Sequence, residues 1–201
     1  MKKISFMCSL ILLVIVGMAF HTSIYAGENI TVAGGEVLPD QQQAEPVESA
    51  ISSVVQKVEY TLPYPGILPD HPLYFLKRLR DTILERLITD PIRKAEFYVL
   101  QSDKRLQMGI MLTDGGKGNL GESTISKAEK YMEQAAVGLS AYKKSGGIVP
   151  PYVVERLEKA TAKHKEVMTD LLEKVQETEK AGLEGSMTLL KEVIASLGSL
   201  K

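Results

Sequence analysis

The chain has 201 residues, with 24 lysines and arginines against 25 aspartates and glutamates, and a single cysteine. This near-neutral balance gives no basic field of the kind that recruits nucleic acid, so we exclude a nucleic-acid-binding protein. The lone Cys8 lies inside the first apolar run, so disulfides and cysteine metal clusters are also excluded for the rest of the chain. The fold must therefore be stabilised by its hydrophobic core.

The first 26 residues have the three parts of a secretory signal peptide. Lys2 and Lys3 precede an apolar run from Ile4 to Phe20, and Ala26 offers a small residue for cleavage. We predict a signal peptide over residues 1–26 and an extracytoplasmic location, either secreted or at the cell envelope. The alternative is an uncleaved membrane anchor, because about 17 to 25 apolar residues span a bilayer. No other membrane contact is predicted.

Residues 27–57 are rich in glycine, proline and glutamine and show no sustained hydrophobic period. Such a segment buries too little apolar surface to offset the entropy of ordering it, so we predict a flexible, disordered linker. Its last residues, from Val47 onward, have a spacing that suits a short helix and an extended run equally well.

The predicted domain covers residues 58–201, and its first helix follows a stiff lead-in. Residues 62–72 contain four prolines and a glycine, which exclude regular helix there. Asp70 is the predicted N-cap of the first helix, with Pro72 in the first turn. Apolar residues then recur at helical steps from Leu73 to Leu87, with charged residues on the other faces.

Further helix signals follow in order. Asp90 is a second predicted N-cap, with Pro91 in the first helical position. The glycine-dense segment 115–121, the Ser145–Gly147 turn and Pro150–Pro151 separate the next elements. Ser186 is the predicted cap of the last helix. The helices after the first are predicted at about 91–113, 122–142, 151–182 and 186–197.

No strand pattern competes with these helices between residues 70 and 200. Each helix carries one apolar stripe, which we expect to pack into a single core. Short loops join neighbouring helices. The sequence therefore predicts an all-α domain of about five helices, arranged as an antiparallel bundle or as stacked helical hairpins.

Several segments together resemble the bacterial domain of unknown function family 5667 (DUF5667), over about residues 60–180. The matching residues are Pro65–Gly66, Pro69-Asp70-His71-Pro72, Tyr74 with Leu76-Lys77-Arg78, Pro91 with Lys94-Ala95-Glu96, Lys104-Arg105-Leu106, and Lys163-His164 with Glu166-Val167. The resemblance implies an exported or membrane-tethered helical domain and offers no catalytic or binding residues to carry over. The chain departs from the family pattern at His71, where a small residue such as serine is expected, and in the 115–121 loop.

Catalytic, cofactor and metal residues are not predicted. His71 and His164 each lack a second histidine or cysteine at ligand spacing, and a metal site needs at least three converging donors. His164 lies on the apolar seam of its helix and is predicted to be a core histidine with one hydrogen bond. On that basis His164→Leu should be tolerated or stabilising. The glycine-dense loop lacks phosphate-loop spacing and a preceding strand, and we expect no enzyme.

A candidate interaction surface lies on the first helix, where basic residues cluster beside an aromatic ring. A face of this kind can dock anionic lipid or a polyanionic wall polymer. The alternative is a core helix whose outward face happens to be basic. The residues of this surface are Tyr74, Lys77, Arg78, Arg80 and Arg86.

The sequence thus favours a secreted or envelope-tethered, non-enzymatic helical module that binds an envelope protein or polymer through a helix face. The alternative is an extracytoplasmic sensor of a small ligand or metal, with its site inside the bundle. An exposed apolar stripe in the structure would favour the first hypothesis, and a buried cluster of polar groups the second.

Overall fold

A computed structural model describes residues 58–201. The signal peptide predicted at 1–26 and the linker predicted at 27–57 lie outside the described residues. Within residues 58–201 no helix is both long enough and apolar enough to cross a membrane. The helices are α2 (Tyr74–Leu87), α3 (Pro91–Asp114), α4 (Gly118–Lys144), α5 (Pro151–Lys174) and α6 (Glu177–Leu197), followed by the 3-10 turn η1 (Gly198–Leu200).

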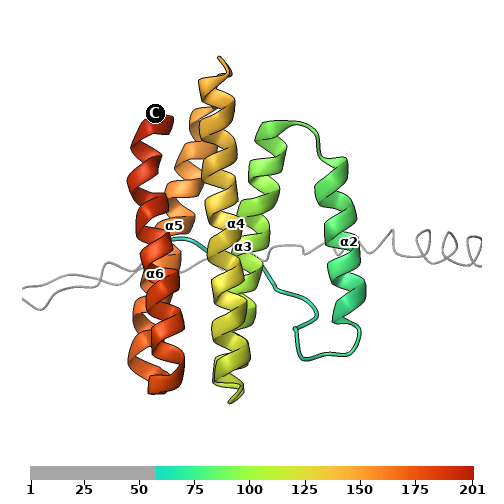
Figure 1. The fold of residues 1–201 in the computed structure, drawn as a ribbon, viewed down its shortest axis with the longest axis vertical. Helices are drawn as coiled ribbons and strands as arrows, with labels where there is room; N and C mark the ends of the chain where they lie inside the picture. The colour runs from blue at the N-terminus through green and yellow to red at the C-terminus, as the bar shows by residue number, and fades with distance from the viewer. Residues whose placement is uncertain (1–57) are drawn as a thin grey trace, which may run out of the picture. The chain divides into compact units, whose positions relative to one another are not determined.

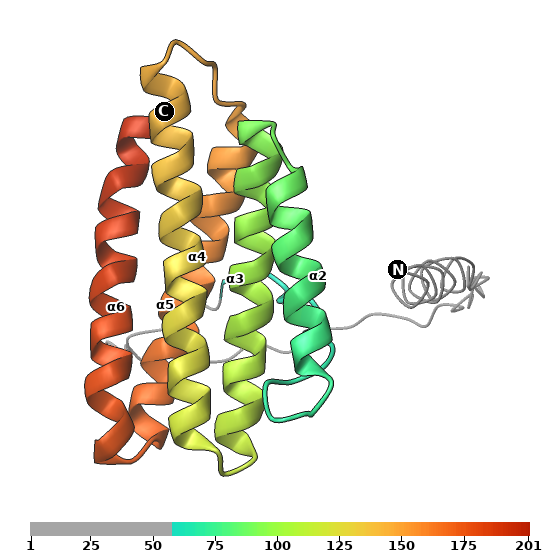
Figure 2. The same ribbon diagram turned by 45° about the vertical axis from the view of Figure 1, so that its right-hand side comes forward.

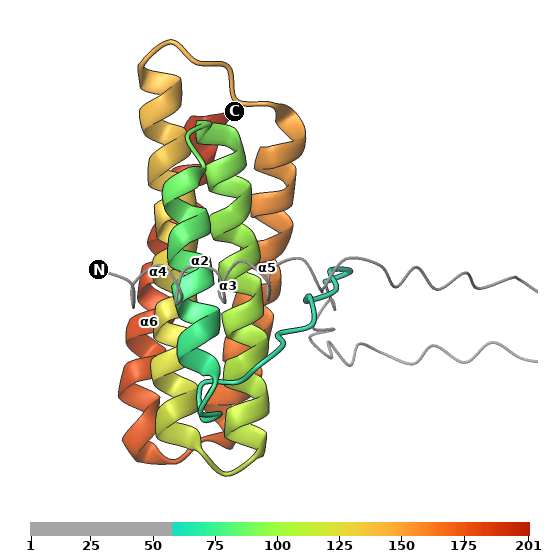
Figure 3. The ribbon, with the colours of Figure 1, turned by 90° about the vertical axis from the view of Figure 1, so that its right-hand side faces the viewer.

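Successive helices run in opposite directions, which confirms the predicted all-α antiparallel fold (Figure 1). Helices α3 to α6 surround a continuous core of leucine, methionine, valine and alanine side chains. Helix α2 lies at the edge of this bundle, beside α3 and on the side away from α6 (Figures 1 and 2). Figure 3 shows the extended segment of residues 58–73, called the lead-in below, which joins α2 from the side of the bundle.

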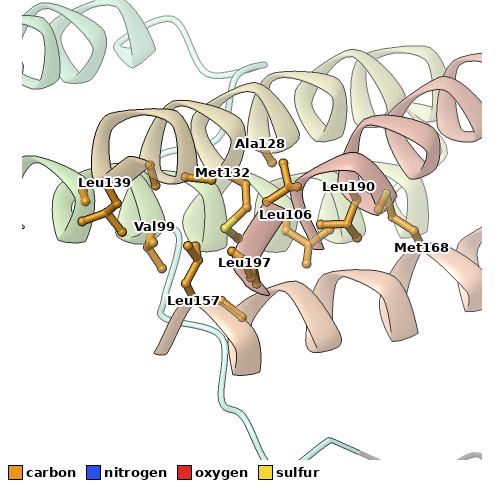
Figure 4. Packing of buried hydrophobic residues seen from close by; sticks show 14 of the residues in the cluster. Val99, Leu106, Ala128, Met132, Leu139, Leu157, Met168, Leu190 and Leu197 are labelled. Atoms are coloured by element: carbon orange, nitrogen blue, oxygen red, sulfur yellow. The ribbon is translucent and has the colours of Figure 1, made fainter. Parts of the chain in front are cut away.

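The core is drawn from all four bundle helices, which point their side chains toward one another (Figure 4). Burying one such side chain contributes about 1.5–3 kcal/mol, so this cluster is the main source of stability. Its members include Val99, Leu106, Ala128, Met132, Leu139, Leu157, Met168, Leu190 and Leu197.

The start of α3 matches the sequence prediction. Asp90 lies in extended backbone, and its carboxylate accepts a hydrogen bond of 2.7 Å from the Arg93 N–H. Pro91 occupies the first helical position, where the missing N–H is no loss because first-turn N–H groups have no partner within the helix. The predicted N-cap is confirmed.

We expect Asp90→Ala to lower the free energy of unfolding by about 1 kcal/mol, because one first-turn N–H loses its acceptor. Comparing urea midpoints of the variant and the original chain measures this loss. Asp90→Asn is the matched control, since its amide oxygen keeps an acceptor at the same place. A midpoint unchanged in Asp90→Ala would contradict the cap.

The predicted role of Asp70 is wrong. Helix α2 begins at Tyr74 and has no side-chain cap, because a turn over the preceding residues delays its start. The Asp70 carboxylate instead forms an ion pair with Lys117 in the α3–α4 loop, which lowers its pKa. The Leu73 N–H donates to Nδ1 of His71 at 3.1 Å, so His71 provides a local acceptor near the helix start.

The α3–α4 connection is shorter than predicted. Gly116, with a φ of 73°, ends α3 in the left-handed conformation, and α4 begins at Gly118 rather than near 122. Gly121 therefore lies inside α4. A Cβ there would lie 2.4 Å from Oγ1 of Thr113 and 3.0 Å from the Gly109 carbonyl oxygen. Gly121 thus allows α3 and α4 to approach closely, and it does not end a helix.

The α5–α6 boundary also differs from the prediction. α5 ends at Lys174, and a two-residue connection leads into α6 at Glu177, so both Gly182 and Ser186 lie inside α6. A Cβ on Gly182 would meet the Glu122 carboxylate of α4 at 2.1 Å. This glycine makes room for the Glu122 side chain, and Ser186 does not cap α6.

Candidate functional site

Helix α2 faces the opposite way from the sequence expectation. Its apolar stripe was expected to pack into the core, but Asp81 is the one α2 residue that is buried, at 5% exposure. The leucine-rich face lies in solvent, with Leu79 56% exposed and Leu87 70% exposed. We call this face the α2 apolar stripe; it consists of Phe75, Leu76, Leu79, Ile83 and Leu87.

The inner face of α2 is polar, and a hydrogen bond joins it to α3. The Tyr98 hydroxyl of α3 donates to the Glu85 carboxylate at 3.1 Å. Lys77 reaches back to the lead-in, where its ammonium donates to the Pro65 carbonyl oxygen. Burial lowers the Lys77 pKa to about 8.

The five residues predicted as an interaction surface do not form one patch. Tyr74 and Lys77 point inward and are partly buried, whereas Arg78, Arg80 and Arg86 are exposed. Arg80 forms an ion pair of 2.7 Å with Asp81. The structure brings only Tyr74 and Arg78 together, in a cleft between α2, α3 and α4.

This cationic cleft has a volume of about 210 Å³ and is lined by two tyrosines and three basic residues. The two residues from α2 meet one from α3 and two from α4. Arg105, Lys127 and Tyr131 could not be connected to α2 from the sequence, because they lie 27 or more positions away from its two cleft residues and only the bundle brings them together. The lining residues are Tyr74, Arg78, Arg105, Lys127 and Tyr131.

A second polar feature lies inside the bundle. Nδ1 of His164 (α5) is 2.7 Å from Oε1 of Glu129 (α4), and Nε2 is 3.2 Å from Oδ1 of Asp103 (α3). The Tyr60 hydroxyl of the lead-in donates to the other Asp103 oxygen at 2.6 Å. His164, Asp103 and Glu129 are at most 1% exposed. We call these four residues the His164 cluster.

The predicted single hydrogen bond of His164 is therefore wrong. Both ring nitrogens contact carboxylates, from residues 35 and 61 positions away. Burial alone would lower the pKa of His164, but the charge of Glu129 and the hydrogen bonds of both carboxylates outweigh it and raise the pKa to about 9. The imidazolium is thus the form that the bundle stabilises at neutral pH.

This raised pKa predicts how stability depends on pH. Because the pKa is about 6.5 unfolded and about 9 folded, the stabilisation is complete below pH 6.5 and is lost as the pH rises through 9. The urea midpoint should therefore fall between pH 7 and pH 9.5. Asp103 and Glu129 face the ring, Tyr60 donates to Asp103, and Arg156 lies near the Tyr60 hydroxyl.

Lys77 titrates in the same pH range with the opposite effect on stability. Burial lowers its pKa to about 8, so the cost of burying its charge disappears as the pH rises above 8. Lys77 should therefore be replaced before the effect of the histidine is measured. Measurements in a Lys77→Gln background isolate the histidine. An NMR titration of the His164 ring protons gives the pKa directly. A midpoint near 6.5 would contradict the proposed charge state.

Among residues 58–201 no group of three or more histidine, cysteine, aspartate or glutamate side chains is arranged to hold a metal ion. The His164 cluster already uses both ring nitrogens in hydrogen bonds. Its chemistry is that of a buried imidazolium between two carboxylates, which holds three bundle helices and the lead-in together.

Fold and sequence together define this chain as an all-α domain whose helices pack antiparallel to one another. It matches a family described as a domain of unknown function (DUF5667) over residues 66–178, and it belongs to that family. The resemblance stated from the sequence motifs is thereby confirmed. No curated protein and no solved structure matches the chain.

Proposed function

We propose that this chain is an exported, non-enzymatic module that binds an envelope protein through the α2 apolar stripe. The observation that supports this is the exposure of the stripe on a helix whose inner face is polar. Contiguous exposed apolar surface is uncommon on soluble proteins and marks interaction sites. Export is supported by the N-terminal sequence pattern.

The stripe suits a protein partner with an apolar groove. Leu76, Leu79, Ile83 and Leu87 recur at the spacing that amphipathic helices use as anchors when they dock into such grooves. Exposed Arg80 and Arg86 lie near the stripe, so charge complementarity calls for acidic residues at the rim of the groove. A sugar polymer offers no comparable apolar surface, which favours the protein over the polymer.

The second candidate function is a sensor with its site inside the bundle, and the His164 cluster is the observation that favours it. Ligand sites are concave and leave open space for their ligand. In the His164 cluster the polar groups meet one another at 2.6 to 3.2 Å. We therefore propose the interaction function first.

Export is tested by intact-mass analysis of the protein recovered from the envelope and the medium. We expect a mature chain that begins at Gly27. A mature species that still carries residues 1–26 would mean that this segment is a membrane anchor and not a cleaved signal peptide.

The interaction is tested by placing a photo-crosslinking residue at Leu79 in the full chain in living cells. Val137 on α4 is the matched control, since it is also apolar and is 61% exposed. We expect one protein to crosslink from position 79 and not from position 137. With that protein purified, Leu79→Glu should raise the dissociation constant of the complex by about tenfold or more, and Val137→Glu should leave it unchanged.

Three other results would contradict the proposed interaction. If the purified chain is a dimer that Leu79→Glu converts to a monomer, the stripe binds a second copy. If Leu79→Glu abolishes binding to lipid vesicles and no protein crosslinks, the stripe binds a membrane surface. If Leu79→Glu leaves the dissociation constant unchanged, the α2 apolar stripe does not take part in the interaction.

A further inference from the structure

The cationic cleft contains a buried arginine without a charged partner. Arg105 is 8% exposed, and its guanidinium donates to the carbonyl oxygen of Gln101 at 3.1 Å and to its side-chain oxygen at 2.7 Å. A third hydrogen bond of 3.4 Å reaches the Tyr131 hydroxyl, and the guanidinium carbon lies 4.1 Å from the centre of that ring. All of these acceptors are neutral.

The other cations of the cleft also lack counter-charges. Among the ion pairs of residues 58–201, none involves Arg78, Arg105 or Lys127. Of the carboxylates on the inner face of α2, Asp81 is already paired with Arg80, and Glu85 accepts a hydrogen bond from Tyr98. A desolvated cation without a counter-ion is costly, so the cleft has an excess of positive charge that an anion would neutralise.

The size of the cleft limits what it can hold. Drug-sized ligands occupy pockets of about 300 to 1,000 Å³, and this cleft is smaller, at about 210 Å³. Since a water molecule takes about 30 Å³ of liquid, a compact oxyanion and a few waters fit. Two arginines from different helices offer several N–H donors, which suits the multiple acceptor oxygens of a phosphate group.

We propose that the cationic cleft is a phosphate-binding site. Arg105 forms its floor, Arg78 and Lys127 contact the anion from the rim, and Tyr74 and Tyr131 form the walls. The site uses the inner face of α2, whereas the proposed protein interaction uses the outer face. The two proposals therefore succeed or fail independently.

Phosphate in this cleft contacts α2, α3 and α4 at once and so ties α2 to the bundle. A ligand that binds the folded state alone raises its stability in proportion to the logarithm of ligand concentration above the dissociation constant. The melting temperature should therefore rise with the logarithm of the phosphate concentration once that concentration exceeds the dissociation constant. Sodium chloride keeps the ionic strength constant in this measurement.

The experiment uses the full chain and inorganic phosphate. Calorimetric titration measures the binding, and thermal circular dichroism measures the melting temperature. We expect saturable binding that weakens about tenfold or more in Arg78→Gln and in Lys127→Gln, since each removes a charge-assisted hydrogen bond. Both residues are exposed, so these variants should fold even if Arg105→Gln does not. Lys144→Gln is the control, because Lys144 is an exposed cation of α4 that does not line the cleft, and this variant should bind as tightly as the original chain.

A second arm distinguishes free phosphate from phosphate carried by a lipid. Vesicles containing phosphatidic acid are compared with vesicles of phosphatidylcholine alone, with the same variants. Binding in either arm that Arg78→Gln and Lys127→Gln weaken supports the site and identifies the carrier. Absence of binding in both arms, or binding that these variants leave unchanged, would overturn the proposal.

Discussion

His164→Leu should lower the free energy of unfolding by about 3–5 kcal/mol, because it leaves two buried carboxylates without their cationic partner. Asp103 and Glu129 are at most 1% exposed, and one Glu129 oxygen already has no hydrogen-bond partner. Urea unfolding at pH 7 measures the loss. This expectation reverses the one drawn from the sequence, in which a leucine would fill an apolar seam at no cost.

Removing the carboxylate charges at the same time should rescue much of this loss. The variant Asp103→Asn, Glu129→Gln, His164→Leu replaces the charge cluster by neutral groups of similar volume, which is often neutral or stabilising relative to a buried ion pair. If His164→Leu alone unfolds at the same urea concentration as the original chain, the ring is not the counter-charge of these carboxylates.

Gly121→Ala should destabilise the domain by about 1–3 kcal/mol, the usual cost of inserting a methyl group into a packed interface. The new Cβ would lie 2.4 Å from the Thr113 hydroxyl oxygen and 3.0 Å from the Gly109 carbonyl oxygen. The Gly109 oxygen belongs to the backbone of α3, so the two helices would have to separate. The urea midpoint and the slope of the transition report the change.

Gly138→Ala is the matched control, since it lies in the same helix with nothing within 4 Å of the added Cβ. There the alanine only improves helix propensity, so stability should rise by about 0.5–1 kcal/mol. Opposite signs at these two positions are the expected result. Equal changes at both would mean that α3 and α4 do not approach closely at Gly121.

The number and type of helices were predictable because local signals specify them. Asp90–Pro91 and Pro150–Pro151 act on the backbone of their own first turns, so they work wherever the helix is placed. The glycine positions were misread for the complementary reason. Gly121 and Gly182 resemble helix ends in sequence, and only the folded structure shows that the α3 backbone lies against Gly121 and the Glu122 side chain against Gly182.

The orientation of α2 and the His164 cluster could not be predicted from the sequence. Amphipathic spacing shows that α2 has an apolar stripe, but not whether the bundle or another surface covers it. His164 lies on an apolar seam, and its partners come from two other helices, so no local pattern connects them. Arg105 was similarly visible only as one more helical cation.

Cysteine labelling of α2 tests the proposed interaction surface most directly. In a Cys8→Ser background the chain has no cysteine, so Leu79→Cys and Asp81→Cys can be compared as single thiols. A thiol reagent should modify position 79 about as fast as in the unfolded chain, and position 81 much more slowly. Rapid labelling at 81 with protection at 79, in a dilute monomeric sample, would contradict the account, because α2 would then turn its leucines onto the bundle.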